Sequence, residues 1–168
     1  MAKEPVPGQV KTRLYLCFLQ DMMTEMSALE GIELAIAYTP GHAGKTFASI
    51  ALKGFLLFAQ RGKGLGERLC NIFMEKLEEG YEAVSIINSD SPDLPMSLVA
   101  ESFQLLSHQA DVVFGPCNDG GYYLIGMKKI CPELFVDIPW STGSVLSKSL
   151  EIARNQVSKQ HCSLHGMI

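Results

Sequence analysis

The sequence holds 168 residues, 47% hydrophobic and 19% charged, with a formal net charge of −4. This length and composition are typical of a globular protein with a full hydrophobic core, and we expect residues 1–168 to form a single domain. The net negative charge argues against general binding to nucleic-acid backbone, and no apolar run in the sequence is long enough to span a bilayer.

Helix-like and strand-like segments alternate along the chain. In chain order the pattern predicts a helix over 16–29, strands over 32–38 and 54–59, a helix over 67–77, a strand over 82–88, a helix over 96–107, strands over 111–115 and 121–127, and a helix over 143–156. This alternation is typical of βαβ units and predicts an α/β fold with a mainly parallel, Rossmann-like sheet and helices on both faces. The last two strands are joined by a short turn, which predicts that they pair antiparallel.

Two carboxylates, Asp90 and Asp93, follow the strand at 82–88. Ligands bind at the carboxyl ends of strands in open α/β sheets, and hard oxygen ligands suit Mg²⁺ or Mn²⁺. The alternative for Asp93 is that it caps the following helix. Asp90 lies too early to be the cap, which favours a metal or ligand role.

The N-terminal segment carries three cations, Lys3, Lys11 and Arg13, in a loop stiffened by prolines and Gly8. Such a loop can present backbone N–H groups and positive charges to a polyphosphate. It lacks the spacing of a Walker A loop. The alternative is a solvated tail with ordinary surface charges.

A glycine-rich segment follows the strand at 54–59 and opens the next helix. Gly62, Gly64 and Gly66 permit close backbone approach to a ligand, and Arg68 adds a charge suited to phosphate. The spacing differs from that of the dinucleotide fingerprint. A plain strand-to-helix turn is the alternative.

Asp119 lies between two predicted strands, followed by Gly120, Gly121 and Tyr122. Asn-Asp-Gly is also ordinary hairpin-turn chemistry, so a purely local role is the alternative. Trp140, the only tryptophan, precedes the last helix, where Ser141 or Thr142 could serve as the N-cap instead of contacting a substrate.

The five cysteines are odd in number, widely spread and without a Cys-x-x-Cys pair. This pattern argues against a disulfide framework or a zinc site and indicates a reducing cytoplasm. No secretory signal pattern opens the sequence.

Together these segments resemble the bacterial nucleotide-diphospho-sugar transferase-like family, which is related in fold to phospholactate guanylyltransferases and molybdenum-cofactor nucleotidyltransferases. The matching segments are Ala2-Lys-x-Pro-x-Pro-Gly-x-Val-Lys-Thr-Arg-Leu14, Gly62-x-Gly-x-Gly-Glu-Arg-Leu69, Ser89-Asp-Ser-Pro-Asp-Leu-Pro95, Gly115-Pro-x-x-Asp-Gly-Gly-Tyr-Tyr-Leu-Ile-Gly126 and Trp140-Ser-Thr142. The family's first strand and its acidic C-terminal motif have no counterpart in this sequence, which we interpret as a truncated or incomplete chain.

The resemblance implies a GT-A-like fold that binds a nucleotide or nucleotide sugar with Mg²⁺ or Mn²⁺. Lys3, Lys11 and Arg13 would then contact phosphates, and Asp90 would hold the metal. Asp119 would border the pocket for the sugar or a small-molecule acceptor, and the substrate-binding residues of that pocket would be Gly120, Gly121, Tyr122 and Trp140. We therefore expect a metal-dependent transferase that uses a nucleotide-sugar donor, with Asp119 as the catalytic carboxylate. The alternatives are a nucleotidyltransferase that uses a nucleoside triphosphate and a phosphorylated small molecule, and a non-catalytic nucleotide-binding module.

Overall fold

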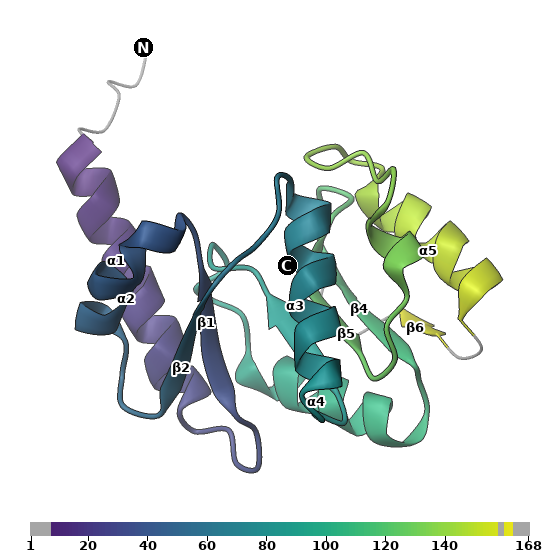
Figure 1. The fold of residues 1–168 in the computed structure, drawn as a ribbon, viewed down its shortest axis with the longest axis horizontal. Helices are drawn as coiled ribbons and strands as arrows, with labels where there is room; N and C mark the ends of the chain where they lie inside the picture. The colour runs from purple at the N-terminus through teal and green to yellow at the C-terminus, as the bar shows by residue number, and fades with distance from the viewer. Residues whose placement is uncertain (1–7, 158–159, 163–168) are drawn as a thin grey trace. The chain divides into compact units, whose positions relative to one another are not determined.

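Figure 1 shows the computed structural model, which describes residues 8–157 and 160–162. Its contacts divide the chain into two compact units. The first unit comprises Met1–Ala59 and Ser89–Asp93, and the second comprises Gln60–Asn88 and Leu94–Ile168. The expectation of one domain stays a prediction.

The first unit is a short βαβ arrangement preceded by a long helix. Strands β1 and β2 pair in parallel, with Leu34 opposite Phe55 and Tyr38 opposite Ala59. A parallel pair needs a crossover connection, and here α2 provides it and packs against β2. The elements of this unit are α1 (Gly8–Met26), β1 (Leu34–Tyr38), the 3₁₀ turn η1 (Gly41–Ala43), α2 (Gly44–Ile50) and β2 (Phe55–Ala59).

The N-terminal part of the chain differs from the expectation of a loop. Helix α1 begins at Gly8 and not near residue 16, so Lys11 and Arg13 are helical. The apolar period of the sequence begins only at Leu16 because the preceding helical turns are exposed, including Val10 and Leu14 at about half of their surface. Burial is restricted to the later part of α1, at Met22 and Met23.

The second unit contains a mixed sheet in the order β3-β5-β4-β6. Strand β5 runs antiparallel to both of its neighbours, β3 and β4, whereas β4 and β6 are parallel. The predicted hairpin is thereby confirmed, although its second strand is inserted between β3 and β4. The elements are α3 (Leu65–Glu78), β3 (Val84–Ile87), α4 (Met96–His108), β4 (Val112–Pro116), β5 (Tyr122–Met127), the 3₁₀ turn η2 (Pro132–Phe135), α5 (Val145–Gln156) and β6 (Gln160–Cys162).

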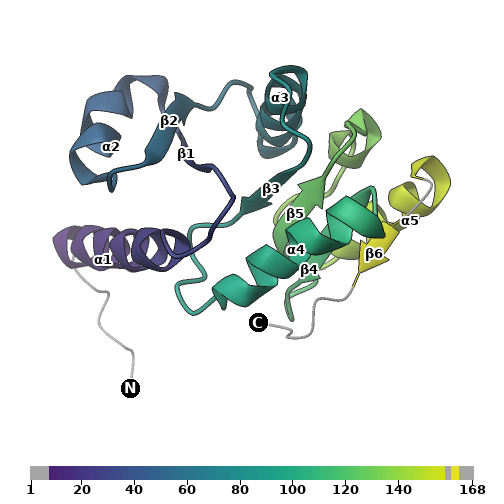
Figure 2. The same cartoon turned by 90° about the horizontal axis from the view of Figure 1, so that it is seen from below.

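Helices cover both faces of this sheet, as expected (Figure 2). On one face Phe114 and Ile125 pack with Phe73 of α3 and Ala153 of α5, all almost fully buried. The opposite face receives α4, because Gly126 lies against the Leu106 side chain. Across the described part of the chain, no helix is both long and apolar enough to cross a membrane.

Candidate functional site

In the first unit, α1 contacts the segment that follows β3. The Tyr15 and Ser89 hydroxyls are hydrogen-bonded at 2.7 Å. Lys11 lies one helical turn before Tyr15 and therefore on the same face of α1. Arg13 lies two residues from each and points to another side, because residues two apart on a helix do not face one another. The structure thus brings Lys11, more than Arg13, toward the Ser89–Asp93 segment.

Both carboxylates of that segment are exposed. Asp90 directly follows the hydrogen-bonded Ser89, and Asp93 lies in the turn that precedes α4. The N-cap of α4 is Pro95, which has no side-chain cap hydrogen bond. The alternative interpretation of Asp93 as the cap of that helix is therefore wrong, and its carboxylate is available for other contacts.

The donors at this segment fit a hard divalent cation better than a zinc-type site. Mg²⁺ is usually held by one or two carboxylates together with waters and substrate phosphates. Asp90 and Asp93 supply carboxylates of that kind. Among the described residues, no group of three or more His, Cys, Asp or Glu side chains could enclose a metal ion.

Lys3 and Gly8 were also predicted to bind phosphate. Lys3 lies outside the described residues. Gly8 is the first residue of α1.

In the second unit, the glycine-rich segment is a turn stabilised by its own side chains. The Arg68 guanidinium Nε donates to the Gly62 carbonyl at 3.1 Å, and the Lys63 backbone N–H donates to the Glu67 carboxylate at 2.8 Å. Gly62 has φ +135°, and a Cβ there would lie 2.9 Å from the Arg68 backbone nitrogen. These contacts support the turn interpretation, while the guanidinium of Arg68 retains further donors for a ligand.

The last glycine of this turn is needed for packing. Gly66 is buried in the first turn of α3. A Cβ at Gly66 would meet the Phe135 carbonyl oxygen and would lie 2.8 Å from Nε1 of Trp140. The tryptophan that sequence analysis placed at the substrate pocket therefore packs directly on the glycine-rich turn.

Asp119 lies in the β4–β5 hairpin and is exposed. Its Oδ1 accepts the Gly121 backbone N–H at 2.9 Å, while the Gly120 N–H donates to the Cys117 carbonyl at 3.2 Å. This is the local hydrogen bonding typical of an Asp in a turn. One carboxylate oxygen, Oδ1, thus serves the backbone of the turn.

The Asp119 hairpin also contacts the loop that precedes α5. A Cβ at Gly120, whose φ is +85°, would collide with the Gly143 carbonyl. The Gly120 carbonyl accepts the Leu146 backbone N–H of α5 at 2.9 Å. Sequence analysis missed Gly143, because a backbone packed against another backbone leaves no signal in the residue pattern.

Tyr122 packs against Trp140. Its ring lies between Phe114, at a centroid distance of 5.5 Å, and Trp140, at 6.4 Å in an edge arrangement. The Tyr122 and Ser149 hydroxyls are both buried, and neither has a hydrogen-bond partner among the residues that the structure describes. Burial raises the pKa of the Tyr122 phenol. Tyr122 is therefore a half-buried residue that packs against Trp140, and its hydroxyl is kept from solvent.

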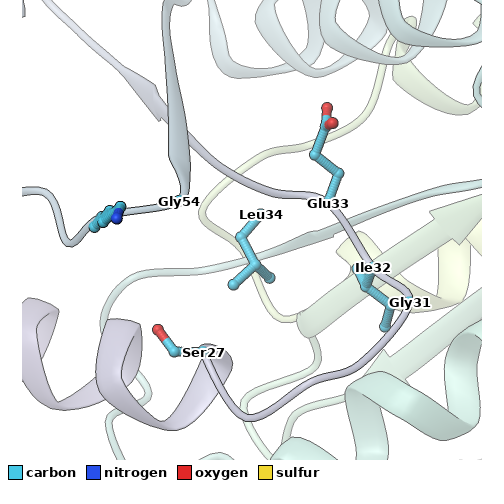
Figure 3. Close-up of a pocket in the computed structure, with 7 residues that line it drawn as sticks. Ser27, Gly31, Ile32, Glu33, Leu34 and Gly54 are labelled. Carbon is cyan, nitrogen blue, oxygen red and sulfur yellow. The ribbon is translucent and has the colours of Figure 1, made fainter.

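A hollow of about 460 Å³ lies in the first unit at the amino ends of β1 and β2 (Figure 3). Ligands in open α/β sheets bind at the opposite ends of the strands. The hollow contains none of the predicted site residues. It is lined by Ser27, Gly31, Ile32, Glu33, Leu34, Lys53 and Gly54.

Comparison with known proteins places the chain in a family. Residues 22–142 match the family model described as "Uncharacterized protein conserved in bacteria (DUF2064)". The chain is 35% identical to a protein from Desulfovibrio desulfuricans G20 whose crystal structure carries the name "putative nucleotide-diphospho-sugar transferase", with a TM-score of 0.79. The match covers 96% of this chain and 77% of that chain. No curated protein matches the chain. The chain belongs to this bacterial family and has the fold of the relative that is named a "putative nucleotide-diphospho-sugar transferase".

Proposed function

We propose that this protein is a metal-dependent transferase that moves a sugar from a nucleotide-sugar donor to a small-molecule acceptor. The observation that carries the proposal is the 35% identity, over 96% of this chain, to a protein named a "putative nucleotide-diphospho-sugar transferase". Lys11 and Asp90, whose types suit phosphate and metal, lie on two segments joined by the Tyr15–Ser89 hydrogen bond, which adds support.

In the first unit, Asp90 and Asp93 would hold Mg²⁺ or Mn²⁺. The ion would supply positive charge to the diphosphate of the donor. Lys11 would add a further cation beside the same segment, because it shares a helical face with Tyr15. Arg13 and Lys3 stay predicted phosphate contacts.

In the second unit, the glycine-rich turn and Arg68 would contact the donor, and the Asp119 hairpin would border the acceptor. In sugar transfer the acceptor hydroxyl forms a bond to the anomeric carbon while the bond from that carbon to the diphosphate breaks. The hydroxyl proton must then be accepted by a base, and Asp119 is the exposed carboxylate that we assign to this role. Gly120, Gly121, Tyr122 and Trp140 would form or support the wall of the same pocket.

Thermal unfolding with matched ligands tests the proposal, since a ligand that binds the native state raises its melting temperature. The ligands are UDP-, GDP-, ADP- and TDP-glucose, together with the corresponding nucleoside diphosphates and triphosphates, each with and without Mn²⁺. We expect at least one of them to raise the melting temperature, and the rise to grow with Mn²⁺. No shift with any nucleotide sugar or nucleoside diphosphate would contradict the proposal. A shift with nucleoside triphosphates alone would favour the nucleotidyltransferase instead.

A further inference from the structure

We propose that Trp140 is the specificity-determining residue of the sugar subsite, recognising the sugar and not the nucleotide of the donor. The inference rests on the proposed function, and it concerns one side chain whose packing the structure gives in detail. Trp140 is half-buried and therefore keeps part of its surface exposed.

The indole is held in place on two sides. Nε1 of Trp140 would be only 2.8 Å from a Cβ added at Gly66, so the ring rests on the first turn of α3. Tyr122 meets the ring edge-on, with ring planes at 82°. Aromatic contacts of this kind add stabilisation beyond the area they bury and restrict how the ring can turn.

The backbone beside the indole is also constrained. Ser141, the next residue, has φ +63°, a left-handed conformation that residues other than glycine adopt only uncommonly. Thr142 Oγ1 donates to the Pro139 carbonyl at 2.7 Å, which closes the loop around Trp140. Strained backbone of this kind persists only where surrounding contacts enforce it, and it is concentrated at functional sites.

The same loop contacts the Asp119 hairpin. Gly143, three residues after Trp140, packs on Gly120, the residue after Asp119. The Leu146 N–H bond to the Gly120 carbonyl fixes this arrangement. A ligand group that lies against Trp140 is therefore presented next to the hairpin that carries the proposed base.

The chemistry of an indole suits a sugar better than a diphosphate. It offers a broad apolar ring and a single N–H donor but no positive charge. A hexose carries C–H groups and hydroxyls, which match both features, whereas a diphosphate requires cations or several N–H donors. Aromatic walls with a few placed polar groups are typical of small-molecule sites.

Trp140 is the only tryptophan of the chain, so its fluorescence reports this position alone. The experiment titrates the protein, in Mn²⁺, with four matched pairs: UDP and UDP-glucose, GDP and GDP-glucose, ADP and ADP-glucose, TDP and TDP-glucose. For the pair that binds, we expect the sugar nucleotide to change the emission while the matching diphosphate leaves it nearly unchanged. Equal changes for both members of the pair would overturn the proposal.

A substitution supplies the second measurement, by calorimetry. Trp140→Phe keeps an aromatic ring but loses the N–H and part of the aromatic surface. We expect this variant to bind the sugar nucleotide about fivefold or more weakly than the wild type, and to bind the diphosphate less than about twofold more weakly. The matched control is Val136→Ala, which alters an exposed residue between η2 and Trp140 and should change neither affinity. Equal losses for both ligands, or none, would overturn the role of Trp140 while leaving the transferase proposal standing. Failure of every pair to bind the wild-type protein would overturn both.

Discussion

The Tyr15 hydroxyl on α1 is hydrogen-bonded at 2.7 Å to the Ser89 hydroxyl, 74 residues further along the chain. This contact brings α1, which carries Lys11 and Arg13, next to the segment that holds Asp90 and Asp93. It also distinguishes two cations that the sequence presents as equivalent, since Lys11 shares the face of Tyr15 and Arg13 does not.

Asp90→Asn should remove the metal dependence of nucleotide affinity. The amide keeps the shape of the side chain but loses the charge that a hard divalent cation requires. We expect the variant to unfold at the wild-type temperature and to bind the nucleoside diphosphate equally with and without Mn²⁺, measured by calorimetry. Asp21→Asn, an equally exposed change on α1, is the control and should keep the Mn²⁺ dependence. A wild-type response in Asp90→Asn would remove Asp90 from the metal site.

Lys11→Ala should weaken nucleoside diphosphate binding more than Arg13→Ala. A charge-assisted contact to phosphate contributes about 1–3 kcal/mol, and only Lys11 lies on the face of α1 that reaches Ser89. Affinities for the diphosphate and for the bare nucleoside separate this effect from misfolding, because the nucleoside should bind both variants alike. Equal losses in the two variants would show that the helical face does not decide the contact.

Asp119→Asn should leave stability nearly unchanged and reduce turnover by roughly a hundredfold or more. Asn retains an oxygen that can accept the Gly121 N–H, so the turn survives the change. It cannot accept a proton as a carboxylate does. Hydrolysis of the donor is a sufficient assay, and turnover at the wild-type rate in a folded variant would return Asp119 to a purely structural role.

Gly120→Ala should destabilise the second unit by about 1–3 kcal/mol more than Gly80→Ala, because a Cβ at Gly120 overlaps the Gly143 backbone. Both glycines have positive φ, +85° and +101°, but nothing lies within 4 Å of a Cβ at Gly80. The pair therefore separates the collision from the cost of the backbone conformation. Urea unfolding gives both values, and equal losses would mean that the hairpin and the loop before α5 are not packed as described.

Stability should fall at alkaline pH through Cys131. Burial, and then the adjacent Glu133 carboxylate, raise the pKa of this thiol to about 11. The unfolded chain releases the proton near the ordinary thiol pKa of about 8.5, while the folded protein keeps it. The stabilising contribution is therefore complete below about pH 8.5 and is lost as the pH rises toward 11. Cys131→Ala should flatten this part of the stability profile, whereas Cys17→Ala, at an exposed position, should not.

The regular alternation of strands and helices could be predicted because β2, α3, β3 and α4 each carry a local apolar pattern. The β4–β5 hairpin was also predictable, since Asn118–Gly120 has local turn chemistry. Helix α2 was missed because none of its residues is buried, so it has no apolar stripe to detect. The insertion of β5 between β3 and β4 depends on contacts between segments far apart in the chain, which no local pattern encodes.

The candidate site, like the fold, could be predicted from the sequence only in part. Residue types identified Asp90, Asp119 and Trp140 as candidates, and these assignments of function stay predictions. The contacts that organise them, Tyr15 with Ser89 and Gly120 with Gly143, are non-local and could not be predicted from the sequence.

The most direct measurement is the identity of the product released from a nucleotide sugar in the presence of Mn²⁺, followed by ³¹P NMR. Our account predicts release of the nucleoside diphosphate by the wild-type protein and loss of that release in Asp119→Asn. The contrary result would be no turnover of any nucleotide sugar, with pyrophosphate released instead from a nucleoside triphosphate and a sugar phosphate.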